Sequence, residues 1–174
     1  MTPAVLFTRE QIAHRVRELA DQISAEHAGR ELLALGILKG SWVFLADLVR
    51  RMTIPVTVDF MMVSSYGAGT VSSGAVKIVL DVKCPVEGRD VLVVEDIIDT
   101  GLTLKYIVDN LKLRMPRSLK VVALLDKPAR RRVDIRADYV GFEVPDKFVV
   151  GYGVDYAERY RNLPYVGYIK EKGE

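Results

Sequence analysis

Two successions of strand, helix and strand constrain the fold of this chain more than any other feature. In each succession, a continuous apolar run is followed by a helical segment and then by a second apolar run. The first covers residues 31–38, 41–52 and 56–65, and the second covers residues 91–97, 102–114 and 119–125. Strands joined through a helix pair in parallel, and strands that are apolar on both faces are covered on both sides. We therefore predict an α/β fold with a mostly parallel twisted sheet flanked by helices.

The segments outside this core are less regular. Thr8 and Gln11 have the spacing of a capping box and precede a helical pattern of apolar residues. Residues 76–82 favour one more strand, and Pro116 separates the second helix from the strand that follows it. Near the carboxyl end, short apolar segments predict strands at residues 139–144, 148–153 and 165–169. We expect these to form a sheet edge, a subunit contact or a small hood made by the chain ends.

The composition limits the possible partners. The chain has 174 residues, 49% of them hydrophobic and 28% charged, which favours a single domain over residues 1–174. Lysine and arginine total 25 and aspartate and glutamate total 23, so no general attraction to nucleic acid or membranes is expected. The one cysteine, Cys84, cannot form an internal disulfide, and no segment has the pattern of a signal peptide or membrane span. These features favour a cytoplasmic location. Residues 64–75, rich in glycine and serine, predict a flexible loop.

The stretch VLVVEDIIDTGLTL, residues 91–104, carries the clearest indication of a binding site. An apolar strand runs into the start of a helix, where backbone amides without intrahelical partners can bind a phosphate. Gly101 permits close backbone approach, and Thr100 and Thr103 add hydroxyl donors. The glycine patterns of nucleotide hydrolases and of dinucleotide-binding folds are absent from the sequence, so this would be a different kind of phosphate site.

Three acids, Glu95, Asp96 and Asp99, crowd the same turn. Carboxylates repel phosphate, but they accept hydrogen bonds from sugar hydroxyls and coordinate magnesium. A phosphorylated ribose meets both requirements, and Asp99 would then lie beside the reacting carbon of the sugar, where a base could handle a proton. The alternative is that the acids only cap the helix and favour its dipole.

This stretch resembles the phosphoribosyl diphosphate loop of the phosphoribosyltransferases, and VEDIIDTGLTL is similar to the form in the hypoxanthine-guanine phosphoribosyltransferases. Similar segments occur in the family's order along nearly the whole chain, including LGILKGSWVFLADLVR, SSYGAGTVSSGAVKI, LLDKPARR and DKFVVGYGVDYAERYRNLPYVG. The resemblance implies the type I phosphoribosyltransferase fold. It also implies transfer of ribose 5-phosphate from phosphoribosyl diphosphate to hypoxanthine or guanine, giving IMP or GMP plus pyrophosphate, with Mg²⁺ as cofactor.

The resemblance implies roles for individual residues, beginning with Asp99 as the catalytic proton acceptor at the purine N7. The residues implied in binding phosphoribosyl diphosphate are Leu38, Lys39, Gly40, Ser65, Tyr66, Glu95, Asp96, Asp99, Thr100, Gly101, Leu102, Thr103 and Arg161. Those implied in purine binding are Lys127, Phe148, Val149 and Asp155, and the implied magnesium ligands are Glu95, Asp96 and Asp155.

The resemblance adds further expectations. Lys127 would donate to the 6-oxo group of the purine and so favour hypoxanthine or guanine over adenine. The family has a cis peptide at the position of Leu38 and Lys39, a lid at Ser65 and Tyr66, and commonly a homodimeric or homotetrameric assembly.

Some of these features have ordinary alternatives. A lysine at a strand end is usually solvated, and a phenylalanine such as Phe148 is more often core. The run Arg130–Arg132 is typical of a solvated surface or subunit contact, although Arg131 could approach the pyrophosphate. A regulator that senses phosphoribosyl diphosphate and binds nucleic acid is the alternative function. The intact base-site residues, Lys127 and Phe148, argue against it. A preference for xanthine or a pyrimidine stays open.

Overall fold

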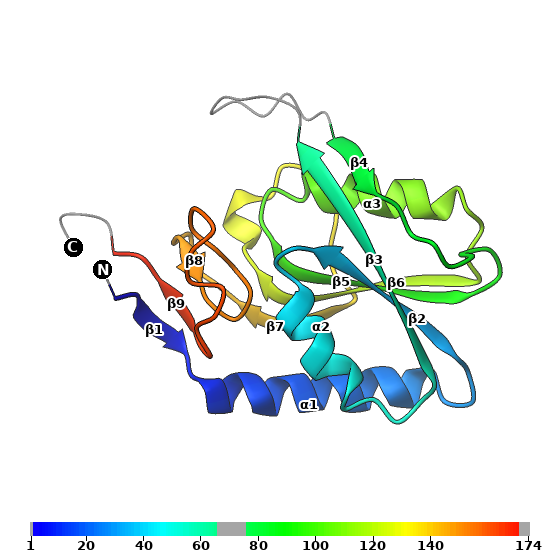
Figure 1. Ribbon diagram of the computed structural model, residues 1–174, viewed down its shortest axis with the longest axis horizontal. Coiled ribbons are helices and arrows are strands. Elements are labelled where there is room, and N and C mark those ends of the chain that lie inside the picture. The colour runs from blue at the N-terminus through cyan, green and yellow to red at the C-terminus, as the bar shows by residue number, and fades with distance from the viewer. Residues whose placement is uncertain (1, 66–75, 171–174) are drawn as a thin grey trace.

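The computed structural model describes residues 2–65 and 76–170 and contains a central six-stranded sheet (Figure 1). The strand order is β4-β3-β2-β5-β6-β7, with β2 (Leu32–Leu38), β3 (Val56–Ser65), β4 (Val76–Leu80), β5 (Asp90–Ile98), β6 (Ser118–Asp126) and β7 (Tyr139–Glu143). All neighbours pair in parallel except β3 and β4. The predicted mostly parallel sheet is therefore confirmed.

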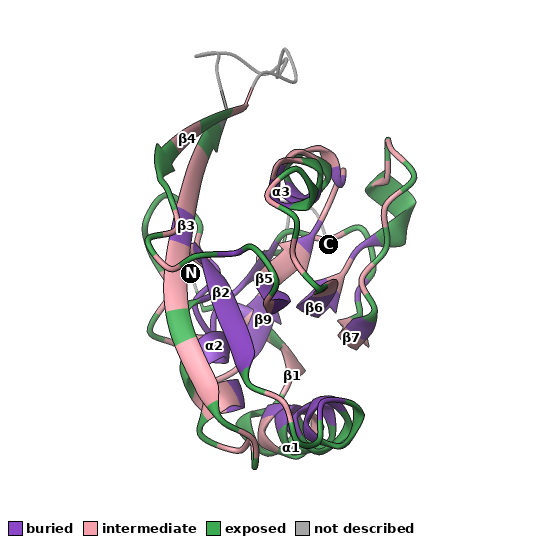
Figure 2. Ribbon diagram, turned by 90° about the vertical axis from the view of Figure 1, so that its right-hand side faces the viewer, coloured by how far each residue is buried: buried purple, intermediate pink, exposed green. Residues whose placement is uncertain are grey.

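Helices cover both faces of this sheet, as the apolar strands require. α1 (Arg9–Glu26) and α2 (Trp42–Val49) lie on one side, and α3 (Leu102–Lys112) lies on the other (Figure 1). Alternate residues of the central strands serve the two faces. Leu32 and Leu92 belong to the core cluster that contains α1 and α2, whereas Leu33 and Val93 belong to the cluster that contains α3. Figure 2 shows these central strands as the most buried part of the sheet.

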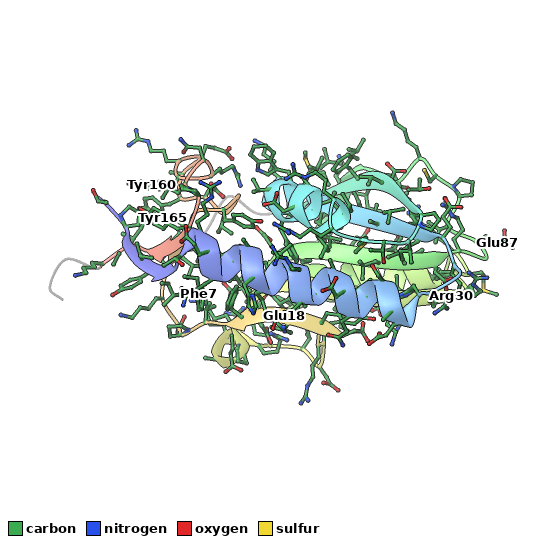
Figure 3. The ribbon with its side chains drawn as sticks, turned by 90° about the horizontal axis from the view of Figure 1, so that it is seen from below. Phe7, Glu18, Arg30, Glu87, Tyr160 and Tyr165 are labelled. Carbon is green, nitrogen blue, oxygen red and sulfur yellow. The ribbon has the colours of Figure 1, made fainter. Side chains whose placement is uncertain are left out.

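The first helix begins as its sequence predicts. The Gln11 amide donates to Thr8 Oγ1 at 3.2 Å, and the Thr8 amide donates to Gln11 Oε1 at 2.8 Å, which completes a capping box. Seen from below, α1 runs along the molecule between Phe7 at one end and Arg30 at the other (Figure 3).

Both ends of the chain form a second, smaller sheet beside the first. Its strands β1 (Ala4–Phe7), β9 (Val166–Tyr168) and β8 (Val149–Val150) pair antiparallel in that order (Figure 1). This is the expected hood, and β7 forms the expected sheet edge. Val149 and Val166 share a hydrophobic cluster with Leu92 of the central sheet, so the hood packs onto the main core.

The structure differs from the sequence prediction in several local features. α2 ends at Val49 rather than at residue 52, and a short 3-10 helix, η1 (Pro128–Arg130), follows β6. The strand β1 was not predicted. Most of the expected flexible loop, residues 66–75, lies outside the described residues. Across residues 2–65 and 76–170, none of the helices has the length and apolar character needed to cross a membrane.

Candidate active site

The carboxyl ends of three adjacent strands carry the site. Lys39 follows β2, Asp99 follows β5, and Lys127 follows β6. Because β2, β5 and β6 are parallel neighbours, these three residues lie at the same edge of the sheet. In open α/β sheets this is the edge where ligands bind.

A small cradle forms where β5 turns into α3. Gly101 has φ +84°, and a Cβ atom there would lie 2.5 Å from Ile135 Cγ2, so the position requires glycine. α3 begins at Leu102, whose amide donates to Thr100 Oγ1 at 3.4 Å, and other first-turn amides have no intrahelical acceptor. The turn borders a cavity of about 100 Å³ lined by Glu95, Ile97, Ile98, Asp99, Thr100, Gly101, Thr103 and Leu104. Such a cradle suits a phosphate group.

A larger cavity of about 480 Å³ lies beside this cradle. Phe148 is 52% exposed in it and packs edge-to-face against Tyr156, with ring centroids 5.1 Å apart. Lys127 is only 6% exposed, and its Nζ donates to the Lys147 carbonyl at 2.8 Å. The lining residues are Ile97, Asp99, Lys127, Arg130, Asp146, Lys147, Phe148, Val149, Val154, Asp155 and Ile169. An exposed aromatic ring and a buried ammonium group suit a flat, polar ring system.

Asp99 and Ile97 line both cavities. Asp99 Oδ1 is buried and makes no hydrogen bond, although it lies 3.0 Å from Arg130 Nε in an ion pair. The carboxylate therefore stands where a group bound in the cradle would meet a ring bound in the larger cavity.

Glu95 and Asp96 form a pair of poorly compensated acids next to the cradle. Burial raises the pKa of Glu95 well above its usual 4.5, and the charge of Asp96 raises it further. Burial also raises the pKa of Asp96, while the Ile97 amide and the charge of Arg161 act in the opposite direction. Bound hydroxyl donors or a cation would relieve this cost. Among residues 2–65 and 76–170, no three metal-ligating side chains converge.

The loop after β2 lies against this acid pair. The peptide bond between Leu38 and Lys39 is cis, as the resemblance implied. A Cβ atom at Gly40 would lie 1.7 Å from Asp96 Oδ2, and one at Gly153, where φ is +100°, would lie 2.3 Å from the Gly40 carbonyl oxygen. The two glycines thus allow the β2 loop, the acid pair and residues 151–154 to meet.

Arg161 holds the outer wall of this region together. Its Nη1 donates to the Gly153 carbonyl at 2.9 Å, its Nη2 lies 3.1 Å from Asp155 Oδ1, and its buried Nε has no hydrogen-bond partner. Asp155 Oδ2 also accepts from the Glu158 amide at 2.8 Å, and Lys39 Nζ lies 3.3 Å from Glu158 Oε2. Positive groups from two separate loops, Lys39 and Arg161, thus pair with the acids Asp155 and Glu158.

Comparison with known proteins identifies the family. A model of the phosphoribosyl transferase domain matches residues 6–157. The chain belongs to the phosphoribosyltransferase family.

Named relatives agree with this family assignment. The chain is 57% identical over 95% of its length to the bifunctional protein TilS/HprT of Listeria monocytogenes, of which it spans only 26%. It is 55% identical to the hypoxanthine-guanine phosphoribosyltransferase of Bacillus subtilis, over 95% of this chain and 92% of that protein. A crystal structure of a Staphylococcus aureus hypoxanthine phosphoribosyltransferase superposes with a TM-score of 0.93 at 50% identity, covering 97% of this chain and 91% of that one.

Most of the site residues expected of a phosphoribosyltransferase lie around these two cavities and the adjoining loops. Ser65 lies in β3, but its side chain and the whole of Tyr66 fall outside the described residues. Arg131, considered for the pyrophosphate region, instead pairs with Asp126 and donates to the Asp99 and Ile135 carbonyls.

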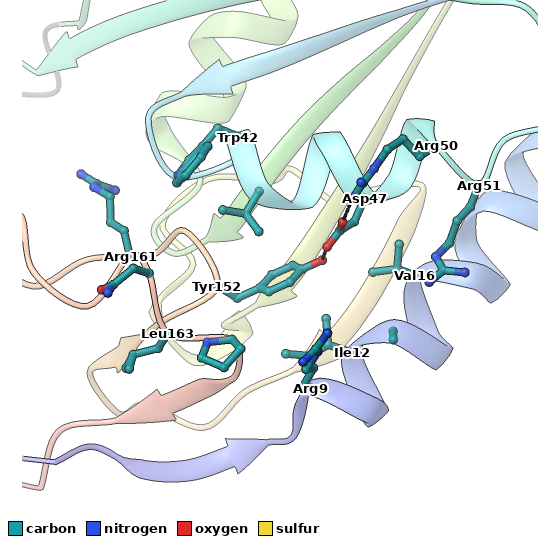
Figure 4. A pocket seen from close by; sticks show the side chains of 14 residues that line it. Arg9, Ile12, Val16, Trp42, Asp47, Arg50, Arg51, Tyr152, Arg161 and Leu163 are labelled. Carbon is teal, nitrogen blue, oxygen red and sulfur yellow. Dashed lines mark hydrogen bonds and ion pairs between the residues drawn. The ribbon is translucent and has the colours of Figure 1, made fainter.

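A cavity of about 620 Å³ lies elsewhere in this phosphoribosyltransferase, between α1, α2 and residues 161–164 (Figure 4). Of the expected site residues that the structure describes, Arg161 alone is in its lining. The lining also contains Tyr152, whose hydroxyl donates to the carboxylate of Asp47, another lining residue, and Trp42, which is 50% exposed. Among the described residues, its lining contains neither the cradle residues, nor Glu95 and Asp96, nor Lys39 or Lys127.

Sequence reasoning missed three residues that line or support the site. Ile97 separates the two cavities, Tyr156 supports Phe148, and Arg130 pairs with Asp99. A signal existed for Arg130, because it lies one 3-10 turn after Lys127 and therefore beside the same strand end.

Proposed function

We propose that this protein transfers ribose 5-phosphate from phosphoribosyl diphosphate to hypoxanthine or guanine, giving IMP or GMP and pyrophosphate in purine salvage. The observation that carries the proposal is the position of Asp99 between the phosphate cradle and the larger cavity. One carboxylate thus faces both the sugar end of a bound donor and the ring that would attack it. The names of the relatives support the same activity.

In this proposal the 5-phosphate binds Thr100–Thr103, and the ribose hydroxyls donate to Glu95 and Asp96. Hydroxyl donors would relieve the unfavourable burial of these two acids. Asp99 accepts the proton of the purine N7 as the new bond to the sugar forms. Its negative charge, with those of the acid pair, also stabilises positive charge that develops on the sugar in the transition state.

The purine occupies the larger cavity. Phe148 stacks on the ring, the Val149 backbone reads the edge of the base, and Lys127 donates to the 6-oxo group. One hydrogen of the Lys127 ammonium is taken by the Lys147 carbonyl, and an ammonium group carries two more donors. An exocyclic amine in place of the oxo group offers no comparable acceptor, so adenine should be a poor substrate.

The pyrophosphate leaves between the loop of Leu38, Lys39 and Gly40 and the side chain of Arg161. The ion pair of Lys39 with Glu158 is exposed on both sides, so an arriving diphosphate can compete for the lysine. The unpartnered buried Nε of Arg161 is a further donor in this region. Ser65 and Tyr66 would close over the donor as a lid.

Magnesium would suit this donor set, since a nearby cation would offset the unfavourable burial of the two acids. Glu95 and Asp96 would hold one ion through the ribose hydroxyls or water, and Asp155 would meet another on the pyrophosphate. The ion would neutralise charge on the departing pyrophosphate. Chelation should therefore abolish turnover, and added Mg²⁺ should restore it.

We also propose that residues 1–174 act as one domain that assembles into a homodimer or homotetramer in the cytoplasm. The core shared by the hood and the central sheet supports a single unit. Exposed aromatic residues, Trp42 at 50% and Tyr156 at 49%, are available for subunit contacts. The free thiol of Cys84 suits a reducing compartment. We expect no membrane or nucleic-acid partner.

The decisive experiment measures pyrophosphate release with phosphoribosyl diphosphate and Mg²⁺, one base at a time. Hypoxanthine and guanine should support release, and adenine and uracil should not. Release with xanthine would test whether the site accepts an oxo group at the 2-position of the purine. Tight binding of phosphoribosyl diphosphate without release for any base would overturn the enzymatic proposal and return attention to a regulator.

A further inference from the structure

The segment 127–132 forms hydrogen bonds to the backbone at Asp99 and on both sides of it. The carbonyl oxygens of residues 98–100 accept hydrogen bonds from the Lys127 amide at 2.9 Å, from Arg131 Nε at 3.2 Å and from the Arg132 amide at 2.8 Å, in chain order. Three consecutive carbonyls are thus held by one short segment that starts at the purine-binding lysine. The turn that carries Asp99 is therefore rigidly attached to the end of β6.

Arg130, in the middle of this segment, contacts the Asp99 side chain. Its Nε lies 3.0 Å from Asp99 Oδ1. Oδ1 is buried, whereas the Asp99 side chain as a whole is 43% exposed, so the exposure of the carboxyl group falls mainly on Oδ2. The arginine therefore occupies the inner oxygen and leaves the outer one open to the cavity.

The same arginine reaches the opposite wall. Its Nη1 lies 3.8 Å from Asp146 Oδ1, two residues before Phe148, and Arg130 itself lines the larger cavity. It thus connects the turn after β5 with the segment that carries the exposed ring. At 48% exposure, the arginine contributes little to the stability of the fold through these pairs.

We infer that Arg130 is a positioning residue for the transfer reaction: it orients the Asp99 carboxylate so that Oδ2 meets the purine proton. This inference rests on the proposed function. Without the arginine, the carboxylate can rotate about its side-chain torsions, and fewer bound complexes have an oxygen in line with N7. Asp99 is the one residue of the cradle lining that Arg130 contacts through a described bond, and the acid pair and residues 100–103 make no such bond with the arginine. Binding of phosphoribosyl diphosphate should therefore be unaffected.

The test compares Arg130→Met and Arg130→Lys with the wild type in steady-state pyrophosphate release. We expect Arg130→Met to lower kcat about fivefold, near the upper limit for an exposed ion pair. The KM for phosphoribosyl diphosphate should not change. Arg130→Lys, which keeps the charge, should recover most of the loss. Arg114→Met is the matched control, since Arg114 pairs with Asp81 near the far end of α3, and its kcat should equal that of the wild type.

A double-mutant cycle separates positioning from general damage. In an Asp99→Asn background, Arg130→Met should cause no further loss of kcat, because its effect passes through the Asp99 carboxylate. An equal loss in both backgrounds, or an unchanged kcat for Arg130→Met in the active wild-type background, would overturn the inference alone. A wild-type protein that releases no pyrophosphate with any base would overturn the proposed function, and this inference with it.

Discussion

The two ends of β5 carry buried acids in opposite circumstances. At the start of the strand, Asp90 is fully buried, and its carboxylate accepts hydrogen bonds from Arg117 Nε at 3.1 Å and from Ser118 Oγ at 2.5 Å. These hydrogen bonds lower the pKa of Asp90 to about 2. At the other end, burial and mutual repulsion raise the pKa of Glu95 well above its usual value. One strand therefore carries an acid paired with an arginine near one edge of the sheet and two neighbouring acids with little compensating charge near the other.

This difference separates stability from function. A buried acid paired with a cation stabilises the folded chain, whereas a buried acid whose charge is poorly compensated weakens it and can gain from a bound ligand. We therefore expect substitutions at the amino end of β5 to change unfolding but not turnover. Substitutions at its carboxyl end should impair the reaction or substrate binding without lowering stability at neutral pH.

The largest effect should come from Asp99→Asn, just beyond the carboxyl end of β5. Loss of the proton acceptor should lower kcat about 100-fold, a typical contribution of general base catalysis. The KM for phosphoribosyl diphosphate and the melting temperature should stay at their wild-type values, since the amide has nearly the same shape. Steady-state kinetics would measure kcat and KM, and calorimetry would measure the melting temperature. Unchanged turnover would remove Asp99 from its proposed role.

At the amino end, Asp90→Asn should lower the free energy of unfolding by about 2 kcal/mol at neutral pH while kcat stays unchanged. The pKa of Asp90 falls from 3.8 to about 2 on folding. The contribution of Asp90 to the free energy of unfolding is therefore fully present at pH values above the pKa of the unfolded chain, and it disappears as the pH falls through the pKa of the folded chain. Urea unfolding of wild type and variant across this range should show the two curves converging in acid. Asp81→Asn, at an exposed pair with Arg114, serves as the control and should show little change. A large fall in kcat for Asp90→Asn would break the comparison between the two strand ends.

A third substitution examines the purine cavity at the end of β6. Lys127→Met keeps an apolar stem of similar length but removes the ammonium donor. The KM for hypoxanthine should rise about 20-fold, in the range of a hydrogen bond made by a charged group. The KM for phosphoribosyl diphosphate should not follow it, and a parallel rise in both constants would argue against a specific contact with the base.

The smallest effect should come from Glu95→Gln. The KM for phosphoribosyl diphosphate should rise about fivefold, because a neutral amide accepts hydroxyl hydrogen bonds less strongly than a carboxylate. Stability at neutral pH should be equal to or higher than that of the wild type. The folded pKa of Glu95 is raised, so without Mg²⁺ the wild type should gain stability relative to the variant as the pH falls through that pKa. Thermal unfolding at several pH values would show this gain, and a wild type that loses stability relative to the variant over this interval would contradict the raised pKa of Glu95.

Much of this arrangement could be predicted from local sequence. The apolar runs that became β2, β5 and β6 are continuous enough to indicate buried parallel strands, and the Thr8 capping box locates the start of α1. The local geometry of the cradle could be predicted as well, because Gly101 and the first amides of α3 are consecutive in the chain. Phosphate binding there stays a prediction. The strand β1 could not, because four residues form a strand only when β9, from the other end of the chain, pairs with them.

The sequence by itself determined the buried strands and the helices that cover the central sheet, and the turn from β5 into α3, since these depend on side-chain period and neighbouring residues. Only the tertiary structure decided which charges meet. Arg130 is one of three consecutive arginines, and its spacing from Lys127 indicates only that it lies near the end of β6; that Arg130 pairs with the Asp99 carboxylate while Arg131 donates to the Asp99 carbonyl follows from the fold. Likewise, Glu95 and Asp90 are both acids of one apolar strand. The pKa of Asp90 is lowered by partners distant in the chain, Arg117 and Arg30 among them, whereas that of Glu95 is raised by burial and by the neighbouring charge of Asp96. Electrostatic energy depends on distance and burial in space, and those follow from the packed fold.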